Sequence, residues 1–333
     1  MMKLPLKGVI TPMATSLLGR DELDCAGLEK LVERIIAGGV NGIFILGTTG
    51  EGPALSYRLR RELITRTCAQ VRFRVPVLVG ITDSAFVESV NVARHAAEAG
   101  ADALVLAPPY YMPSAQPELL EYLGHLLPEL TLPLFLYNMP ALTKVVYGEE
   151  ILRWALDQSC IVGLKDSSKD MVYYSRAQSL IRKRPDWSIL MGPEELLAES
   201  IKLGGDGGVP GGSNLFPQLY VRVCEAAFRG DFQTAEIFQA QIQRVSDAVY
   251  RLGAHSSGVV KGIKCVLSLL GVCNDFLAEP FHRFRGEQRA IMQHRLQELE
   301  SQVHAVLSTG ILPAPAPLAA KQDQASGVAG AIY

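Results

Sequence analysis

The chain has 333 residues, of which 48% are hydrophobic and 20% charged, and its formal net charge is −2. This near balance of charge argues against nucleic acid or an anionic membrane as the main partner. The sequence has no apolar run of about 18 residues and no secretory leader pattern at its start, so we expect a cytoplasmic protein.

Six cysteines are scattered singly along the chain. Because no Cys-x-x-Cys pair occurs, a structural zinc site and a thioredoxin-type redox pair are not expected. Isolated, buried thiols are typical of a reducing compartment. The cysteines are Cys25, Cys68, Cys160, Cys224, Cys265 and Cys273.

Short apolar runs alternate along the chain with longer segments that have helical periodicity. The runs are apolar at nearly every position, which is typical of parallel strands buried on both faces. The expected strands are Gly8–Pro12, Gly42–Leu46, Pro76–Ile81, Ala103–Ala107, Pro133–Tyr137, Ile161–Lys165, Ser188–Met191 and Gly207–Val209.

The segments between these runs carry apolar residues at spacings of three and four, which predicts amphipathic helices. Glycines follow several of them, as at Gly39 and Gly100, where a left-handed helix end is expected. The expected helices are Leu28–Ala37, Arg58–Val71, Val87–Ala99, Pro117–Leu127, Glu149–Asp157, Met171–Ile181, Glu195–Leu203 and Phe216–Phe228.

Eight strand–helix alternations predict a closed parallel (β/α)₈ barrel, although the length alone would also allow two domains. We place the barrel in residues 1–230 and a helical extension in residues 231–308. The extension contains three further expected helices, Asp231–Leu252, Val259–Leu270 and Glu287–Leu307. Residues 309–333 are rich in Pro, Ala, Gln, Ser and Gly, and we expect a flexible tail there.

Lys165 ends the apolar run that begins at Ile161. Catalytic groups of such barrels lie at the carboxyl ends of the strands, so the Lys165 side chain is expected to enter the barrel mouth. Low-dielectric walls disfavour an ammonium ion, and a neutral lysine is a competent nucleophile towards a carbonyl. The alternative is a structural ion pair between Lys165 and Asp166.

Tyr137 ends the preceding run, one strand–helix unit before Lys165. Since sequential strands of a barrel are neighbours, the phenol is expected beside the amine, where it could pass protons. The alternative is an aromatic side chain that only fills the barrel.

Two glycine-rich loops follow strands. Gly47-Thr48-Thr49-Gly50-Glu51 offers backbone N–H groups and two hydroxyls to an anion such as a carboxylate. The loop around Val209, within residues 207–214, is either a second anion site or a tight turn at the barrel rim. The six histidines are dispersed without ligand spacing, so no metal site is expected.

Five motifs, in order and in spacing, resemble the pyruvate-dependent lyase family that contains dihydrodipicolinate synthase and N-acetylneuraminate lyase. The resemblance extends from about residue 5 to about residue 300. The motifs are Gly47-Thr48-Thr49-Gly50-Glu51, Pro108-Pro109-Tyr110-Tyr111, Tyr137-Asn138-Met139-Pro140, Gly163-Leu164-Lys165-Asp166 and Gly204-Gly205-Asp206-Gly207-Gly208.

The resemblance implies that Lys165 forms a Schiff base with pyruvate and that Tyr137 shuttles protons. Thr48 and Thr49 would bind the pyruvate carboxylate, with Thr48 also in the relay. Tyr111 matches a tyrosine that completes the relay across a subunit interface in the synthase branch. The family is typically a tetramer built as a dimer of dimers and needs neither metal nor cofactor beyond the covalent imine.

Leu142 and the motif that begins at Gly192 bear on the second substrate. The synthase branch has an arginine, where this chain has Leu142, to hold the carboxylate of aspartate semialdehyde. A leucine cannot replace a bidentate guanidinium. The motif Gly192-Pro193-Glu194-Glu195 resembles the sugar-acid branch, in which two acids accept hydrogen bonds from substrate hydroxyls. The expected substrate-binding residues are Gly47, Thr49, Leu142, Gly192, Glu194, Glu195 and Val209.

The sequence therefore favours an aldolase that reversibly cleaves a 2-oxo-3-deoxy hydroxy acid into pyruvate and an aldehyde. Dihydrodipicolinate synthase, which condenses pyruvate with aspartate semialdehyde, is the alternative within the family. A dehydratase acting through the same Schiff base is also open. From another class, the alternative is a non-catalytic barrel that binds a 2-oxo acid.

Overall fold

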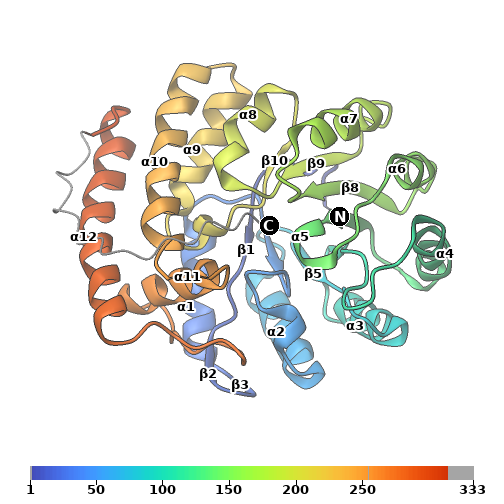
Figure 1. The fold of residues 1–333 in the computed structure, drawn as a ribbon, viewed down its shortest axis with the longest axis horizontal. Helices are drawn as coiled ribbons and strands as arrows, with labels where there is room; N and C mark the ends of the chain where they lie inside the picture. Colours follow the sequence, from blue (N-terminus) through green and yellow to red (C-terminus); the bar gives the residue numbers. More distant parts are fainter. Residues whose placement is uncertain (1, 254, 314–333) are drawn as a thin grey trace, which may run out of the picture.

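Parallel strands form a closed barrel at the centre of the molecule (Figure 1). The computed structural model describes residues 2–253 and 255–313, and eight of the strands within them make up the barrel. Neighbouring strands follow the chain order, and β1 closes the ring against β10. The (β/α)₈ prediction is therefore confirmed. The strands are β1 (Gly8–Pro12), β4 (Gly42–Ile45), β5 (Val77–Gly80), β6 (Ala103–Leu106), β7 (Leu134–Asn138), β8 (Ile161–Asp166), β9 (Ser188–Met191) and β10 (Gly207–Gly208).

Successive residues of each strand serve two separate cores, because side chains alternate between the faces of a strand. Phe44 and Phe135 point into a core that fills the barrel interior. Their neighbours Ile43 and Leu136 belong to a second core that includes the surrounding helices. Both faces are thus buried, which explains the near-continuous apolar runs in the sequence.

The weakest expected strand, at Gly207–Val209, is present as β10 but without a large apolar side chain in the strand itself. Gly207 is the register partner of Gly8 in β1 and has a φ of 132°. A Cβ atom at Gly207 would lie 2.0 Å from the carbonyl oxygen of Gly8. The barrel closes where two strands approach too closely for any residue except glycine.

The helices that surround the barrel agree with the expected segments to within a few residues. Gly39 and Gly100 have the expected positive φ values, 83° and 84°. The segment expected over Glu195–Leu203 divides into a 3₁₀ turn and a short helix. The barrel helices are α1 (Cys25–Ala37), α2 (Tyr57–Val71), α3 (Phe86–Glu98), α4 (Gln116–Leu126), α5 (Pro140–Thr143), α6 (Glu149–Leu156), α7 (Met171–Ile181), α8 (Leu197–Lys202) and α9 (Pro217–Phe228), with 3₁₀ turns η1 (Gly52–Ala54), η2 (Leu127–Glu129), η3 (Glu194–Leu196) and η4 (Gly211–Asn214).

Three further helices extend the structure beyond α9: α10 (Phe232–Tyr250), α11 (Gly258–Leu269) and α12 (Gly286–Thr309). Helix α10 runs beside α9, and α12 forms the outer edge of the molecule (Figure 1). The flexible tail that we expected over residues 309–333 lies, from residue 314 onward, outside the described residues. In the described part of the chain, no helix combines the length and apolar character that crossing a membrane requires.

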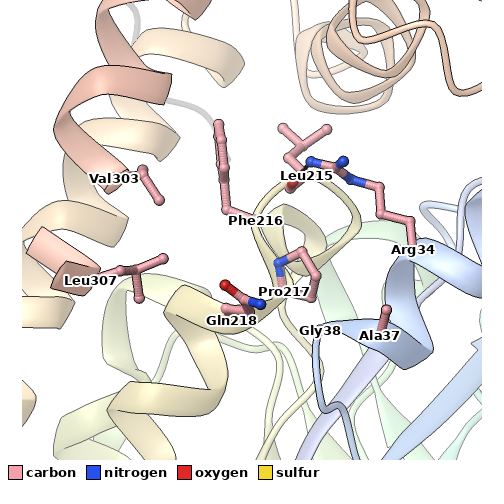
Figure 2. A pocket seen from close by; sticks show the side chains of 9 residues that line it. All are labelled: Arg34, Ala37, Gly38, Leu215, Phe216, Pro217, Gln218, Val303 and Leu307. Atoms are coloured by element: carbon pink, nitrogen blue, oxygen red, sulfur yellow. Dashed lines mark hydrogen bonds between the residues drawn. The ribbon is translucent and has the colours of Figure 1, made fainter. Parts of the chain in front are cut away.

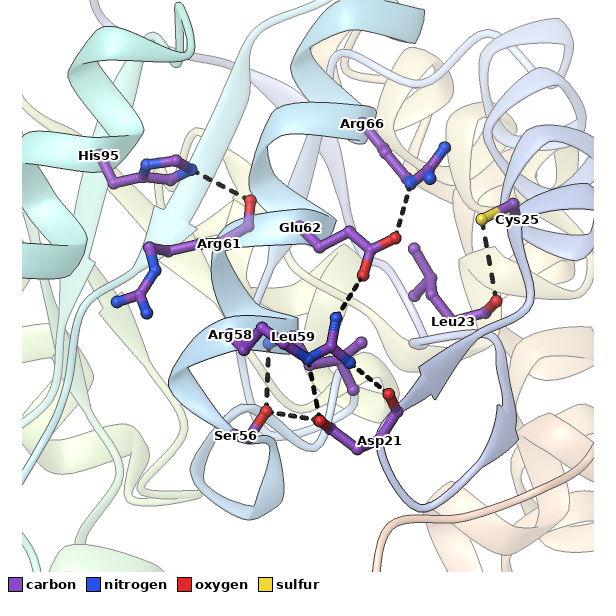
Figure 3. Close-up of polar contacts among 10 residues, drawn as sticks. All are labelled: Asp21, Leu23, Cys25, Ser56, Arg58, Leu59, Arg61, Glu62, Arg66 and His95. Atoms are coloured by element: carbon purple, nitrogen blue, oxygen red, sulfur yellow. Dashed lines mark hydrogen bonds and ion pairs between the residues drawn. The ribbon is translucent and has the colours of Figure 1, made fainter.

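Two elements were not expected from the sequence. The first is α5, which follows β7 directly, and the second is a hairpin of β2 (Leu17–Gly19) and β3 (Glu22–Leu23). The turn of the hairpin is bound to the start of α2: Asp21 accepts hydrogen bonds from Ser56, the N-cap of α2, and from Arg58 (Figure 3). This hairpin is short and partly polar, so it gives little periodic signal.

Candidate active site

A small cavity opens at the carboxyl ends of the strands, where catalytic groups of such barrels lie. Its volume is about 180 Å³. Most of the lining side chains are apolar or aromatic, with a few hydroxyl groups among them. The lining residues are Phe44, Leu46, Gly47, Thr48, Pro53, Gly80, Thr82, Val105, Ala107, Tyr110, Tyr137, Met139, Leu142 and Thr143.

Lys165, in β8, lies against the aromatic rings that line this cavity. Its side-chain nitrogen is 3.7 Å from the ring centre of Tyr137 and 5.0 Å from that of Phe44. The residue is only 6% exposed, and burial lowers its pKa below the ordinary value of 10.5. The amine is therefore more readily neutral, as a nucleophile must be.

The alternative role of Lys165, an ion pair with Asp166, is not what the structure shows. The Asp166 carboxylate accepts hydrogen bonds from Asn138 Nδ2, at 2.8 Å, and from the hydroxyl of Ser168, at 2.9 Å. Adjacent residues of a strand point to opposite faces, so Asp166 is turned away from the barrel interior into which Lys165 points.

Tyr137 lies beside Lys165 because the two residues are register partners on the neighbouring strands β7 and β8. Its hydroxyl is 3.3 Å from Thr48 Oγ1. Burial by itself would raise the pKa of the phenol. The nearby Lys165 and the hydroxyls of Thr48 and Ser167 outweigh it and lower that pKa. A chain of hydroxyls thus leads from the amine towards the loop after β4.

Gly47 and Thr48 line the cavity, and Thr49 is half-buried in the same turn. The turn is closed by the hydrogen bond from Glu51 N to Thr48 O, at 3.1 Å. On its other side, the buried hydroxyl of Thr15 donates to Gly50 O at 2.6 Å. Thr48 is therefore held close to Tyr137 on a well-tethered loop, and Thr49 follows it in the same turn.

Tyr111 is placed differently from the other expected catalytic residues. Its side chain is 90% exposed, its φ is 79°, and it does not line the cavity within the single chain. The neighbouring Tyr110 lines the cavity instead. The structure therefore does not bring Tyr111 to Tyr137, and its role in a relay stays a prediction.

Leu142 lies on the short helix α5, 54% exposed, and lines the outer part of the cavity with Met139 and Thr143. No arginine, lysine or histidine is among the lining residues of the cavity. The distal wall is therefore apolar where a carboxylate-binding pocket would need a cation.

Glu194 does not face the cavity, contrary to the role expected for it. Its carboxylate accepts hydrogen bonds from the Tyr220 hydroxyl at 2.8 Å, the Tyr250 hydroxyl at 3.0 Å and Gly212 N at 2.8 Å. The side chain is buried, and burial raises its pKa to about 7. Because both oxygens are occupied by these internal donors, Glu194 is a poor acceptor for substrate hydroxyls.

Glu195, Gly192 and Val209 also do not line the cavity. Glu195 forms an ion pair with Lys169, 3.0 Å away, between the loops after β9 and β8. A Cβ atom at Gly192 would lie 1.9 Å from Ser167 Oγ, so Gly192 leaves space for that hydroxyl. Val209 is buried in the barrel-interior core.

Among the residues of the site that the sequence analysis missed are Phe44, Tyr110 and Met139, which line the cavity, and Ser167, which hydrogen-bonds to Tyr137. Ser167 follows Lys165 by two positions, and residues i and i+2 of a strand share a face. Continuing the alternation one residue past β8 would therefore have predicted its hydroxyl on the same side as Lys165, where it contacts Tyr137. Phe44 could not be distinguished from an ordinary core residue of its strand, because its apolar side chain fits the buried pattern of that strand.

A larger cavity of about 420 Å³ lies elsewhere, between α1, α9 and α12 (Figure 2). It is lined by apolar side chains such as Phe216, Val303 and Leu307, together with Arg34. It carries no nucleophile or carboxylate and lies away from the strand ends, so we do not assign the reaction to it. Among residues 2–253 and 255–313, no cluster of three or more His, Cys, Asp or Glu side chains could hold a metal ion.

Comparison with known proteins decides the family. The model of the Dihydrodipicolinate synthetase family matches residues 5–299. The chain belongs to this family. Members of the Dihydrodipicolinate synthetase family are lyases, and this protein is therefore a lyase.

Its relatives in the family include proteins named as synthases and a protein named as a putative sugar-acid aldolase. The structure of dihydrodipicolinate synthase from Bacteroides thetaiotaomicron is 48% identical, with a TM-score of 0.87 over 89% of this chain and 100% of that one. The putative 2-dehydro-3-deoxy-D-gluconate aldolase YagE of Escherichia coli is 30% identical over 76% of this chain and 84% of its own length. The 4-hydroxy-tetrahydrodipicolinate synthase of Bartonella quintana is 30% identical over 83% and 92%.

Proposed function

We propose that this family member is a Schiff-base aldolase that reversibly cleaves a 2-oxo-3-deoxy hydroxy acid into pyruvate and an aldehyde. The observation that carries the proposal is the buried amine of Lys165, 3.7 Å from the Tyr137 ring at the mouth of the barrel. A desolvated amine next to a phenol has the two functions that imine formation needs, a nucleophile and a proton carrier.

In the proposed reaction, neutral Lys165 attacks C2 of the oxo acid, and the carbinolamine loses water as Tyr137 and Thr48 pass protons. The C4 hydroxyl then gives up its proton, the C3–C4 bond breaks, and its electron pair moves into the protonated imine to form an enamine. The aldehyde leaves. Protonation of C3 and hydrolysis of the imine release pyruvate and restore Lys165, so no cofactor or metal is required.

The loop after β4 is the proposed site for the carboxylate of the oxo acid. It presents the Thr48 and Thr49 hydroxyls and consecutive backbone N–H groups, and such a turn suits an anion. Thr48 Oγ1 is also 3.3 Å from the Tyr137 hydroxyl. A carboxylate bound here would hold C2 near the amine of Lys165.

The remaining part of the cavity supports a short, uncharged aldehyde. The whole cavity measures about 180 Å³, and its outer wall is formed by apolar groups of Met139 and Leu142 with Tyr110. A buried carboxylate needs a paired cation, and none lines this wall. Glu194 is engaged inside the protein, so we do not assign the binding of substrate hydroxyls to it.

Dihydrodipicolinate synthase is the second candidate, and the 48% identity with the synthase of Bacteroides thetaiotaomicron favours it. Leu142 argues against it, because the synthase branch has an arginine at the corresponding position. A coupled assay with aspartate semialdehyde and with short hydroxyaldehydes separates the two candidates. Turnover of the semialdehyde alone would reverse our ranking.

The first experiment is borohydride reduction in the presence of pyruvate, followed by mass spectrometry of the peptides. We expect a reduced pyruvate adduct on Lys165 and none on the variant Lys165→Met. A non-catalytic barrel would instead be thermally stabilised by pyruvate while Lys165 stays unmodified, and that result would refute the proposed chemistry.

We also propose that the protein is a homotetramer, assembled as a dimer of dimers, in which Tyr111 reaches the cavity of a partner subunit. The support is the family resemblance and the 90% exposure of the Tyr111 side chain on a backbone with positive φ. An exposed aromatic side chain in such a conformation suits an interface. Sedimentation analysis of the wild type and of Tyr111→Asp tests it, because a buried charge should separate the subunits.

A further inference from the structure

A buried ion pair joins the helical extension to the loop after β4. Lys264 of α11 and Glu51, the last residue of the Gly47–Glu51 motif, approach to 2.5 Å between Nζ and Oε2. Their side chains are 0% and 1% exposed. The proposed reaction uses neither residue, although a buried pair of charges is costly to maintain.

Every polar atom of this pair has a defined partner. Besides Glu51, Lys264 Nζ donates to the carbonyl oxygen of Phe276 at 2.6 Å. The second carboxylate oxygen of Glu51 accepts from Ala278 N at 2.8 Å. Both oxygens of Glu51 are therefore bound by the helical extension, from α11 and from the segment that follows it. Such complete hydrogen bonding makes a buried ion pair tolerable.

The Glu51 backbone has a conformation that needs support from outside the loop. Its φ is 57° and its ψ 25°, the left-handed region that side-chain-bearing residues seldom occupy. Such conformations persist where surrounding contacts fix them. In this conformation Glu51 N reaches Thr48 O, and Gly52 N reaches Gly47 O at 3.2 Å.

The turn so formed carries Thr48, whose hydroxyl is 3.3 Å from Tyr137. Its other tether is the hydrogen bond from Thr15 to Gly50 O. Loss of the Glu51 contacts would leave the turn held on one side. The left-handed residue could then relax to an extended conformation and move Thr48 and Thr49 out of position.

We infer that Lys264 and Glu51 are positioning residues through which the helical extension fixes the carboxylate-binding turn of the barrel. The inference rests on the proposed function in one respect, namely that the ligand of this turn is the carboxylate of a 2-oxo acid. Without the pair, part of the binding energy of the oxo acid would be used to select the correct turn from several conformations. The KM for pyruvate should rise, and kcat at saturating pyruvate should change less.

Three variants test the inference. Glu51→Gln combined with Lys264→Met removes both charges, and the amide can still accept from Ala278 N. Glu51→Ala removes every contact of the carboxylate. Lys264→Met alone and Glu51→Ala each leave one buried charge without its partner and can unfold the protein, so the paired variant carries the test.

The matched control is Arg289→Met. Arg289 pairs with Asp275 at 2.6 Å in the same extension, and Asp275 keeps Arg283 as a second partner at 3.2 Å. This variant weakens the extension without touching the turn. If the control and the paired variant lose equal melting temperature, a change in the turn or in the KM for pyruvate that occurs only in the paired variant reflects a positioning role and not general destabilisation.

The first readout is hydrogen exchange of the peptide containing residues 46–55, which needs no substrate. We expect faster exchange there in both Glu51 variants and unchanged exchange in Arg289→Met. The second readout is pyruvate dependence of borohydride trapping and of turnover. We expect KM to rise about tenfold in the paired variant, the effect of losing roughly one charged hydrogen bond, with kcat falling less.

The outcomes distinguish this inference from the proposed function. Unchanged exchange in the turn would overturn the inference whatever the substrate is. Faster exchange with an unchanged pyruvate KM would also overturn it, because the turn would then not control binding. If the wild type itself forms no adduct with pyruvate, the proposed function fails, and the exchange data still decide whether the pair fixes the turn.

Discussion

The amine of Lys165 lies over the ring of Tyr137, 3.7 Å from its centre, and the two residues are paired across β7 and β8. A π face attracts an ammonium ion, which would favour the charged form. The same rings exclude water from the nitrogen, and burial outweighs the attraction, so the pKa of Lys165 is lowered. The pair thus combines a poorly solvated amine with a phenol hydroxyl that is in hydrogen-bond contact with it.

Tyr137→Phe keeps the ring over the amine and removes the hydroxyl that contacts Thr48. We expect the fold and melting temperature to be nearly unchanged and turnover to fall by roughly 10²–10⁴, the usual range for a general acid–base group. Steady-state kinetics beside a thermal melt measure both. A near-normal rate would remove Tyr137 from the mechanism.

The pH dependence of adduct formation follows from the lowered pKa of Lys165. Since only the neutral amine attacks the ketone, the trapping rate at limiting pyruvate should rise with pH and level off below pH 10.5, the ordinary pKa of a lysine. The proximity of Tyr137 partly raises that pKa. In Tyr137→Phe the inflection should therefore move to lower pH. An inflection at 10.5 or above would contradict a desolvated amine.

The barrel, Lys165 and Tyr137 could be predicted because their signals are local in the sequence. Apolar runs define strands buried on both faces, and a polar residue at the end of a strand marks the barrel mouth. Neighbouring strands then bring the two residues together without any further information. The same alternation rule, applied two positions later, would have predicted Ser167.

The orientations of the Glu194 and Tyr111 side chains could not be predicted from strand ends and alternation. The orientation of Glu194 depends on Tyr220 in α9 and Tyr250 in α10, more than twenty residues away in the sequence. Motif similarity suggested a substrate ligand, whereas tertiary contacts provide internal partners. Tyr111 is 90% exposed and lies outside the strands, so the alternation that places Lys165 and Tyr137 does not apply to it.

Leu142→Arg tests the proposed specificity for an uncharged aldehyde. Leu142 is 54% exposed at the outer wall of the cavity, so a guanidinium can be accommodated there with its charge partly solvated. Because such a group binds a carboxylate in a bidentate manner, kcat/KM for aspartate semialdehyde should increase about tenfold or more relative to a neutral aldehyde.

Leu142→Met serves as the matched control, since it preserves apolar character and approximate volume. The ratio of kcat/KM for the two aldehydes should be unchanged in this variant. If the wild type already prefers the semialdehyde and Leu142→Arg adds nothing, the specificity is determined elsewhere in the site.

The buried carboxyl of Glu194 should make stability depend on pH. Its pKa rises from 4.5 to about 7 in the folded chain because of burial. Between these values the folded chain holds a proton that the unfolded chain releases, so the free energy of unfolding contributed by this group falls as pH rises from about 4.5 to about 7. Glu194→Gln cannot ionise and should lack this component.

We therefore expect the melting temperature of Glu194→Gln, relative to wild type, to increase between pH 5 and pH 8, as measured by thermal denaturation at several pH values. The amide oxygen can still accept from Gly212 N and the Tyr250 hydroxyl, which share one carboxylate oxygen of Glu194, and the amide NH2 can donate to the Tyr220 hydroxyl oxygen. A melting-temperature difference that is constant with pH would mean that Glu194 keeps the same charge in folded and unfolded chains. Its three internal donors would then outweigh its burial.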